Sequence, residues 1–272
     1  MTHGTHLRQF TGTRITVLII VTFISVSCSV KEMREACPCR VGLDFSKLLP
    51  QAASGGEILA TVSAENGKIL YRRDFGTDTC SPRYEILLPK GVYTASALLS
   101  SGEAVWIEED DGIRLQAGSQ ADSLYGQATL LDARGEEAEY VPQPLKQFAT
   151  LFILFGSPVR DLGVEVALPA SFIAASDLSA VASPFSVKST FSGVSGSVRL
   201  PRQTGGNIFV TFYEEDGNSP IARVDLEPML RRIGYDFNAP ELADIFLTMD
   251  FAAGQATIEV EGWKESFIIV TF

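Results

Sequence analysis

Residues 57–75 read EILATVSAENGKILYRRDF and predict a β-hairpin. Two runs with β-branched and aromatic residues, 57–64 and 68–75, flank a turn at Glu65-Asn66-Gly67. Asn-Gly tolerates the positive φ angles that a tight hairpin turn requires. This stretch indicates an antiparallel β-protein, and the same pattern recurs on both sides of it.

Strands are predicted through the rest of the first half as well. A single strand over 41–45 precedes the hairpin, and three further pairs follow it. These pairs join 84–88 to 92–99 across Pro89-Lys90-Gly91, flank the acidic turn 108–112, and join 128–132 to 137–141. Pro142-Gln143-Pro144 then interrupts the pattern, because proline cannot donate to a sheet ladder.

The second half repeats this organisation. The apolar run 148–155 (FATLFILF) predicts a central strand, and three more strands are expected at 164–168, 186–191 and 197–200. Hairpins are predicted from 208–213 with 221–226 and from 247–251 with 256–260, and short helices at 228–233 and 240–245. The chain is therefore predicted to be all-β, with tandem β-sandwich domains at 41–144 and 145–272 and one or two short helices in the second.

The first 27 residues predict a cleavable lipoprotein signal. Arg8 and Arg14 are basic, and the apolar run 15–24 is shorter than the roughly 20 residues of a membrane-spanning helix. The small residues Ser25-Val26-Ser27 then precede Cys28, which is the predicted lipidation site, carrying diacylglycerol and palmitate. Residues 28–40 would form the lipidated leader. An ordinary signal peptide cleaved at small residues is the alternative.

Composition excludes several classes of function. The chain has 22 basic and 33 acidic residues, and residues 1–27 contain two of the arginines and both histidines. The 20 basic and 33 acidic residues that remain give a charge of −13, which opposes binding to nucleic acid or anionic lipid. Without histidine the mature chain has no Ser-His-Asp triad and no histidine-ligated zinc site. We predict a non-enzyme with no catalytic residues, no metal site and no cofactor.

Three cysteines follow Cys28. In an oxidising compartment Cys80 is predicted to form a disulfide with Cys37 or Cys39, which leaves one thiol over. A direct bridge between Cys37 and Cys39 would close a strained ring across Pro38. The spacing also differs from the CxxC motif of redox proteins.

Both ends of the mature chain carry a family resemblance. Cys28-Ser29-Val30-Lys31-Glu32, then Cys37-Pro38-Cys39 and the strand ending at Leu43-Asp44-Phe45, resemble the FimB-type anchor subunits of type V fimbriae. Residues 225–245 (DLEPMLRRIGYDFNAPELADI) and 256–263 (ATIEVEGW) are similar to the end of the second domain of these proteins. The resemblance implies two transthyretin-like Greek-key sandwiches.

The resemblance also implies a location and partners. Such a protein is lipid-anchored in the cell outer membrane and exposed at the surface, holds a fimbria at its base and influences fibre length. Its partners are fimbrillin pilus subunits, which assemble by strand addition. In such pili a protease removes an N-terminal strand from each polymerising subunit, and a C-terminal strand of the neighbour fills the groove.

An anchored subunit cannot lose its N-terminal segment without losing its tether. Residues 41–45 are therefore expected to fill their own groove, so that the chain enters the fibre only as a donor. The candidate donor strand is Phe267, Ile268, Ile269, Val270, Thr271 and Phe272, which has no charge and no proline. Pairing of this strand within its own second domain is the alternative.

Three other functions stay open at this point. A stalk or tip subunit of the same pili would share the signal and the sandwich domains. A surface glycan-binding lipoprotein would need an exposed aromatic platform, for which Trp106 and Trp263 are candidates, although alternation in their strands favours burial. A carboxylate-dependent enzyme would need two carboxylates that face each other in a cleft.

Overall fold

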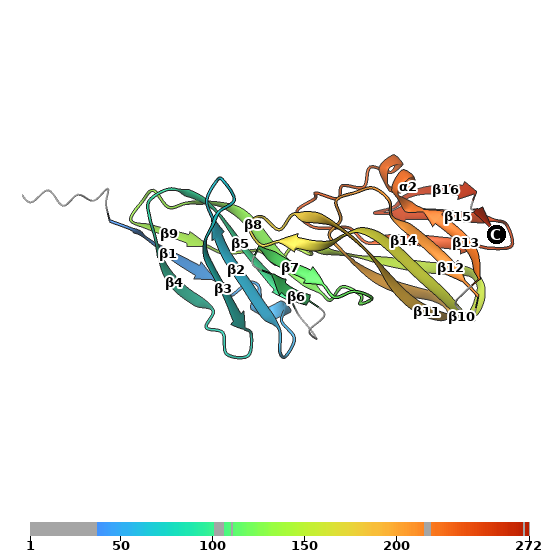
Figure 1. Cartoon of the computed structure of the whole chain (residues 1–272), viewed down its shortest axis with the longest axis horizontal. Coiled ribbons are helices and arrows are strands. Elements are labelled where there is room, and N and C mark those ends of the chain that lie inside the picture. Colours follow the sequence, from blue (N-terminus) through green and yellow to red (C-terminus); the bar gives the residue numbers. More distant parts are fainter. Residues whose placement is uncertain (1–36, 101–105, 110, 215–218, 269, 272) are drawn as a thin grey trace, which may run out of the picture.

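The computed structural model describes residues 37–100, 106–109, 111–214, 219–268 and 270–271. Figure 1 shows two β-structures that follow one another along the long axis of the molecule. Strands make up nearly all of the regular structure, and α2 (Leu226–Arg232) is the one α-helix within the described residues. The predicted all-β fold is confirmed.

The N-terminal half contains two sheets that share a core. One sheet has the order β4 (Arg83–Leu88), β1 (Cys39–Asp44), β9 (Glu137–Tyr140). The other has the order β3 (Ile69–Gly76), β2 (Glu57–Ser63), β5 (Val92–Ser100), β8 (Leu124–Asp132). Inward side chains of both sheets, and the 3-10 helix η2 (Leu49–Gln51) that follows β1, enclose one apolar cluster drawn from residues 39–140.

The hairpin predicted over 57–75 is confirmed as β2 and β3. Glu57 pairs with Gly76 at one end of this hairpin, and Ser63 pairs with Ile69 near the turn. Gly67 has a φ of 79°, and the Asn66 side chain accepts a hydrogen bond of 3.1 Å from the Lys68 N–H. The turn residues therefore act as their conformational preferences predict.

Two predicted hairpins of this half are wrong. β4 pairs with β1 in one sheet, whereas β5 lies between β2 and β8 in the other. In the same way β8 and β9 belong to different sheets. Both edges of β5 are occupied, so Pro89-Lys90-Gly91 connects the two sheets and does not close a hairpin. Gly91 instead exchanges backbone hydrogen bonds with Ala133, which lies in the connection between β8 and β9.

The C-terminal half is built on two long strands. β10 (Phe148–Ala174) and β11 (Ala180–Pro201) pair along most of their length. β14 (Ile245–Asp250) pairs with β10 at 151–155, and β12 (Phe209–Tyr213) pairs with it at 163–167. β15 (Gln255–Val260) pairs with β14, and β16 (Trp263–Ile268) pairs with β15 at one edge of the sheet. β13 (Pro220–Asp225) pairs with β12, and β17 (Val270–Thr271) pairs with β13 at the other edge.

This ten-stranded sheet folds over a single core. The register of β10 against β11 shifts between Leu154 and Leu162, where Asp161 has a φ of 46° and Gly193 a φ of 98°. Such irregularities bend a strand pair. The stretches before and after the bend form the two layers, and both contribute to one apolar cluster from residues 149–260. Strands predicted separately at 148–155 and 164–168 are therefore parts of one bent strand.

One of the two predicted helices is present. The Asp225 side chain caps α2 by accepting a 3.2 Å hydrogen bond from the Glu227 N–H, and Gly234 follows the helix with a φ of 75°. The helical turn predicted at 240–245 is wrong. Asp244 instead accepts a 2.6 Å bond from the Thr150 N–H and pairs with Lys146, which holds this segment alongside the start of β10.

The limits predicted for the two domains stay a prediction. One hairpin crosses between the halves: β6 (Trp106–Glu109) pairs with β7 (Gly112–Leu115), and β7 pairs with the end of β10. Across the part of the chain that the structure describes, no helix has the length and apolarity to traverse a bilayer.

Candidate functional site

The turn between β10 and β11 connects the two halves. The Thr61 hydroxyl donates a 2.6 Å hydrogen bond to the Ala175 carbonyl, and the Ser96 hydroxyl contacts the same oxygen. The Ser63 hydroxyl donates to the Ser176 carbonyl at 3.3 Å. These hydroxyls come from β2 and β5, so the turn docks on the outer face of the N-terminal four-stranded sheet.

Leu178 is the strained residue of this turn. Its φ is 60°, a left-handed conformation that costs a non-glycine residue about 1–2 kcal/mol. Its side chain is only 5% exposed and belongs to an apolar cluster with Leu59 and Leu98 of the first half and Ile173 of the second. Packing between the two halves therefore offsets the backbone strain.

Arg202 and Gln147 form a second connection. The Gln147 carbonyl oxygen accepts from Arg202 Nε at 3.0 Å and from Nη2 at 2.8 Å. The Gln147 amide nitrogen donates to the carbonyls of Gly126 in the first half and Pro240 in the second, at 2.9 and 3.0 Å. The Gln147 side chain thus joins both halves, and both of its N–H groups donate hydrogen bonds.

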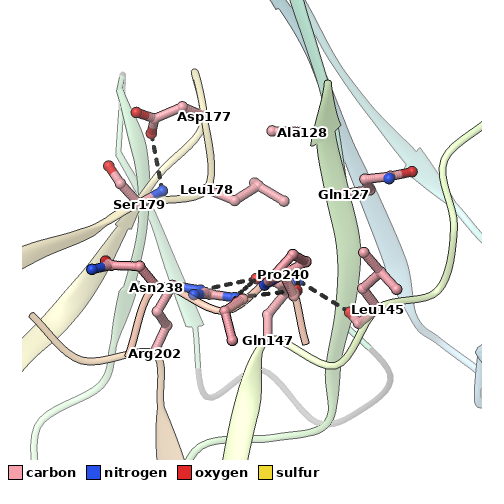
Figure 2. Close-up of a pocket in the computed structure, with 11 residues that line it drawn as sticks. Gln127, Ala128, Leu145, Gln147, Asp177, Leu178, Ser179, Arg202, Asn238 and Pro240 are labelled. Atoms are coloured by element: carbon pink, nitrogen blue, oxygen red, sulfur yellow. Dashed lines mark hydrogen bonds between the residues drawn. The ribbon is translucent and has the colours of Figure 1, made fainter. Parts of the chain in front are cut away.

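A cleft of about 330 Å³ lies at this junction (Figure 2). Leu178 projects from one wall toward Ala128 of β8 on the other, while Arg202, Gln147 and Pro240 lie at the base. The side chain of Gln127 points away from the cleft in Figure 2, and its oxygen accepts from the Gln143 N–H at 2.9 Å. The base is therefore polar, and the walls combine the apolar Leu178 and Ala128 with the polar Asp177 and Ser179.

The guanidinium at the base has an uncommon environment. Arg202 is only 7% exposed, and burial lowers its pKa, which the charges of Tyr235 and Asp236 partly oppose. Its hydrogen bonds go to Gln147 and to the carbonyls of Phe237, Ala239 and Pro240. Among the described residues no carboxylate is hydrogen-bonded to Arg202, although a buried charge is usually paired.

The segment that follows the predicted leader is the middle strand of its sheet. β1 pairs antiparallel with β4 and parallel with β9. Cys39, Val41 and Leu43 face inward and are fully buried, while Arg40, Gly42 and Asp44 face outward. The expectation that 41–45 fills a groove of its own domain agrees with this placement. Cys28 lies outside the described residues, so its lipidation stays a prediction.

The structure does not form the predicted disulfide, since Cys37, Cys39 and Cys80 are all free. The register of β1 explains this: Cys39 faces Leu88 at one end of the strand, whereas the Phe45 N–H meets Pro82 beyond the other end. Cys80 lies at that second end, so the length of β1, about 16 Å, separates it from Cys39. A disulfide needs Cα atoms within about 7 Å. Burial also raises the pKa of the Cys39 thiol, which disfavours the reactive thiolate.

The candidate donor strand lies at both edges of its own sheet. Residues up to Ile268 pair with β15 as part of β16, and Val270 and Thr271 pair with Arg223 and Ala222 of β13. Ile269 and Phe272 lie outside the described residues. The alternative of pairing within the second domain is thus the arrangement found in this chain, while donation to another subunit stays a prediction.

The two tryptophans have different outcomes. Trp263 is 71% exposed at the start of β16, so burial in the core of its own chain is wrong, and burial at an interface with another protein stays a prediction. The side chain of Trp106 lies outside those that the structure describes. One exposed ring gives the glycan-binding alternative limited support.

Sequence reasoning missed the junction residues Gln147, Leu178 and Arg202. A polar residue that ends a β-strand resembles ordinary surface, and a left-handed leucine leaves no compositional signal. The sequence Pro201-Arg202-Gln203 does end a strand with two long polar side chains, but only the fold places both inside.

Comparison with solved structures relates this fold to surface proteins. A protein from Bacteroides thetaiotaomicron described as polysaccharide-binding matches with a TM-score of 0.58 and 14% identity, over 84% of this chain and 98% of that one. The fimbrial anchor protein Mfa2 from Porphyromonas gingivalis matches with 0.56 and 14%, over 84% and 99%. A Bacteroides thetaiotaomicron protein described as an adhesin matches with 0.55 and 12%, over 84% and 97%.

No protein-family model matches the sequence, and a search of curated proteins also finds no match. The matched structures are covered almost completely, so both halves and their connection belong to the shared fold. The chain therefore has the fold of a fimbrial anchor protein, in agreement with the resemblance of its sequence to FimB-type anchor subunits.

Proposed function

We propose that this chain is a lipoprotein of the cell outer membrane that anchors a type V fimbria at its base and influences fibre length. The single observation that carries this proposal is the position of β1. A strand with neighbours on both sides and a buried inner face is an integral part of its domain. A subunit that retains this strand also retains the leader before it, and with the leader the tether on Cys28.

The proposal assigns the chain no catalytic activity and no cofactor. Its partners are fimbrillin subunits, and it contacts the membrane through lipid only, since the charge of −13 on residues 28–272 (20 basic and 33 acidic residues) opposes attraction to anionic lipid. The fold shared with Mfa2 supports this role. A stalk or tip subunit is the competing assignment, and it requires removal of the N-terminal strand during assembly.

Replacement of the lipidated cysteine tests the tether. Cys28→Ala should abolish palmitate labelling, move the protein out of the membrane fraction and release intact fibres into the medium. Cys37→Ala is the matched control, because Cys37 is free and exposed, and it should leave labelling and attachment unchanged. Membrane-bound and palmitate-labelled Cys28→Ala protein would overturn the tether. Wild-type protein that is found along the fibre shaft and has lost both β1 and the palmitate label would identify a stalk subunit.

Deletion of residues 267–272 tests strand donation. If the segment is donated, the truncated protein should fold and reach the membrane, but fibres should detach. If the segment only completes its own sheet, the truncation should unfold the second half, with loss of protease resistance. A folded truncation that still holds fibres on the cell would exclude this segment as the donor.

A further inference from the structure

The cleft at the junction combines features that point to a ligand. Its volume of about 330 Å³ lies at the lower end of the range for small-molecule sites, and such sites often occur between domains. Its base holds a guanidinium with no carboxylate partner within the described part of the chain. Its walls include the apolar side chains of Leu178 and Ala128 (Figure 2).

The hydrogen bonds of Arg202 are nearly complete. The guanidinium has five N–H groups. Nε donates to Gln147, Nη1 to the Phe237 carbonyl at 2.9 Å, and Nη2 to Gln147 and the Ala239 carbonyl, both at 2.8 Å. One N–H of Nη1 therefore remains without a partner among the described residues. The groups that accept hydrogen bonds from Arg202 fix its position and are all neutral. Among the described residues no carboxylate is bonded to it directly, and the charge of Asp236 acts on it without such a bond.

Two carboxylates lie near the cleft, and neither is hydrogen-bonded to Arg202. Asp236, whose charge acts on the guanidinium, is exposed, and its Oδ1 accepts a 2.8 Å hydrogen bond from the Asn238 N–H. Asp177 is exposed at the rim, where its Oδ1 accepts a 2.9 Å hydrogen bond from the Ser179 N–H, and its side chain points away from the base in Figure 2. A solvated carboxylate at this position is screened from a buried guanidinium.

We infer that the cleft binds a carboxylate carried on a small apolar body. The carboxylate would accept from Arg202 at the base, and the apolar body would lie between Leu178 and Ala128. A charge-assisted hydrogen bond inside a partly buried site is stronger than a neutral one, so charge should decide the affinity. A free short branched acid and the C-terminus of a peptide that ends in an apolar residue present this same chemistry. The inference does not depend on the proposed anchoring role.

The test compares a carboxylate with its neutral isostere. Isovalerate and isovaleramide have the same shape, and each is titrated into the full-length protein in detergent by calorimetry. A third titration uses the peptide acetyl-Gly-Gly-Val with a free C-terminus, together with its C-terminal amide. We expect at least one carboxylate to bind with a Kd of about 1 mM or lower. Its amide should bind about tenfold more weakly or not at all.

A cavity-filling variant locates the binding. Ala128→Leu extends a side chain into the cleft from the wall opposite Leu178, and by clashing with the ligand it should reduce affinity about tenfold or more. Thr129→Leu on the same strand is the control, because adjacent residues of a strand face opposite sides, and it should bind like wild type. Both variants are first checked for an unchanged circular dichroism spectrum and melting temperature.

Comparison of the peptide with isovalerate identifies the source of the carboxylate. Binding of the peptide but not of isovalerate identifies a peptide terminus as the source of the carboxylate, and the reverse identifies a free acid. The inference is overturned if neither carboxylate binds at 10 mM (about the weakest affinity that would matter), if acid and amide bind equally, or if a folded Ala128→Leu protein binds like wild type.

Discussion

Leu43→Ala in β1 tests whether the N-terminal strand is held in the core as the structure has it. Leu43 is 1% exposed and faces Tyr84 of β4 on one side and Tyr140 of β9 on the other. The substitution removes three carbon groups from a fully buried position. Their transfer accounts for about 2.4 kcal/mol at about 0.8 kcal/mol each. The cavity left between the two sheets raises the expected loss of unfolding free energy to about 3–5 kcal/mol.

Leu87→Ala is the matched control for this measurement. Leu87 lies in the neighbouring strand β4, opposite Arg40, but it is 67% exposed. The same truncation should change the unfolding free energy by less than about 0.5 kcal/mol, because no buried contact is lost. Urea unfolding followed by circular dichroism gives both values, provided that the slope of free energy against urea is the same in the two variants.

Equal effects of the two substitutions would refute the reasoning. A cost below about 1 kcal/mol for Leu43→Ala would mean that the groove closes without β1 or that the strand leaves it in solution. Because the position of β1 is the observation on which the anchor proposal rests, that result would also remove its main support. A stalk subunit that surrenders its N-terminal strand would then be the better assignment.

Three further predictions concern the junction and the response to pH. The double variant Thr61→Val and Ser96→Ala removes both hydroxyls that contact the buried Ala175 carbonyl. It should lower the free energy of unfolding by about 1–3 kcal/mol, which a lower urea midpoint would show. Burial raises the pKa of Tyr140, so its contribution to folding stability is fully present below the ordinary tyrosine pKa of about 10 and decreases above it. In Tyr140→Phe the melting temperature should therefore decrease less at alkaline pH. Burial raises the pKa of Glu165, but its side-chain hydrogen bonds have the larger effect, so the net pKa is lowered. The contribution of Glu165 to folding stability is therefore present above about pH 4.3 and is lost as the pH falls further. Glu165→Gln should reduce this loss of stability in acid.

The local sequence predicts where the strands of this protein lie better than it predicts which strands pair. The Asn66-Gly67 turn specifies a hairpin because its preferred angles act over a few residues. By contrast, the pairs proposed at 84–88 with 92–99 and at 128–132 with 137–141 have correct strands but wrong partners. Alternation shows which face of a strand is buried, but not which of two stacked sheets contains it.

The candidate site could not be predicted from the sequence for a related reason. Arg202 and Gln147 are polar residues that solvent would satisfy equally well, and only the meeting of two halves encloses them. Leu178 adopts a left-handed angle because contacts from both halves hold its side chain in place. The bend of β10 near Asp161 likewise depends on the two layers that it joins, and the sequence there predicts a break between strands.

β1 and β17 differ in how many residue pairs are described for each, and this difference bears on assembly. β1 pairs at six positions with β4 and at four with β9, and its inward side chains are part of the core. Among the described residues, β17 pairs at two positions, both with β13. Release of a strand costs the hydrogen bonds that it makes, so the pairing described for β17 opposes release less than the pairing of β1 does. If this chain exchanges a strand with a pilus subunit, the C-terminal segment is the one that its own pairing leaves available, and the N-terminal strand is the one that it keeps.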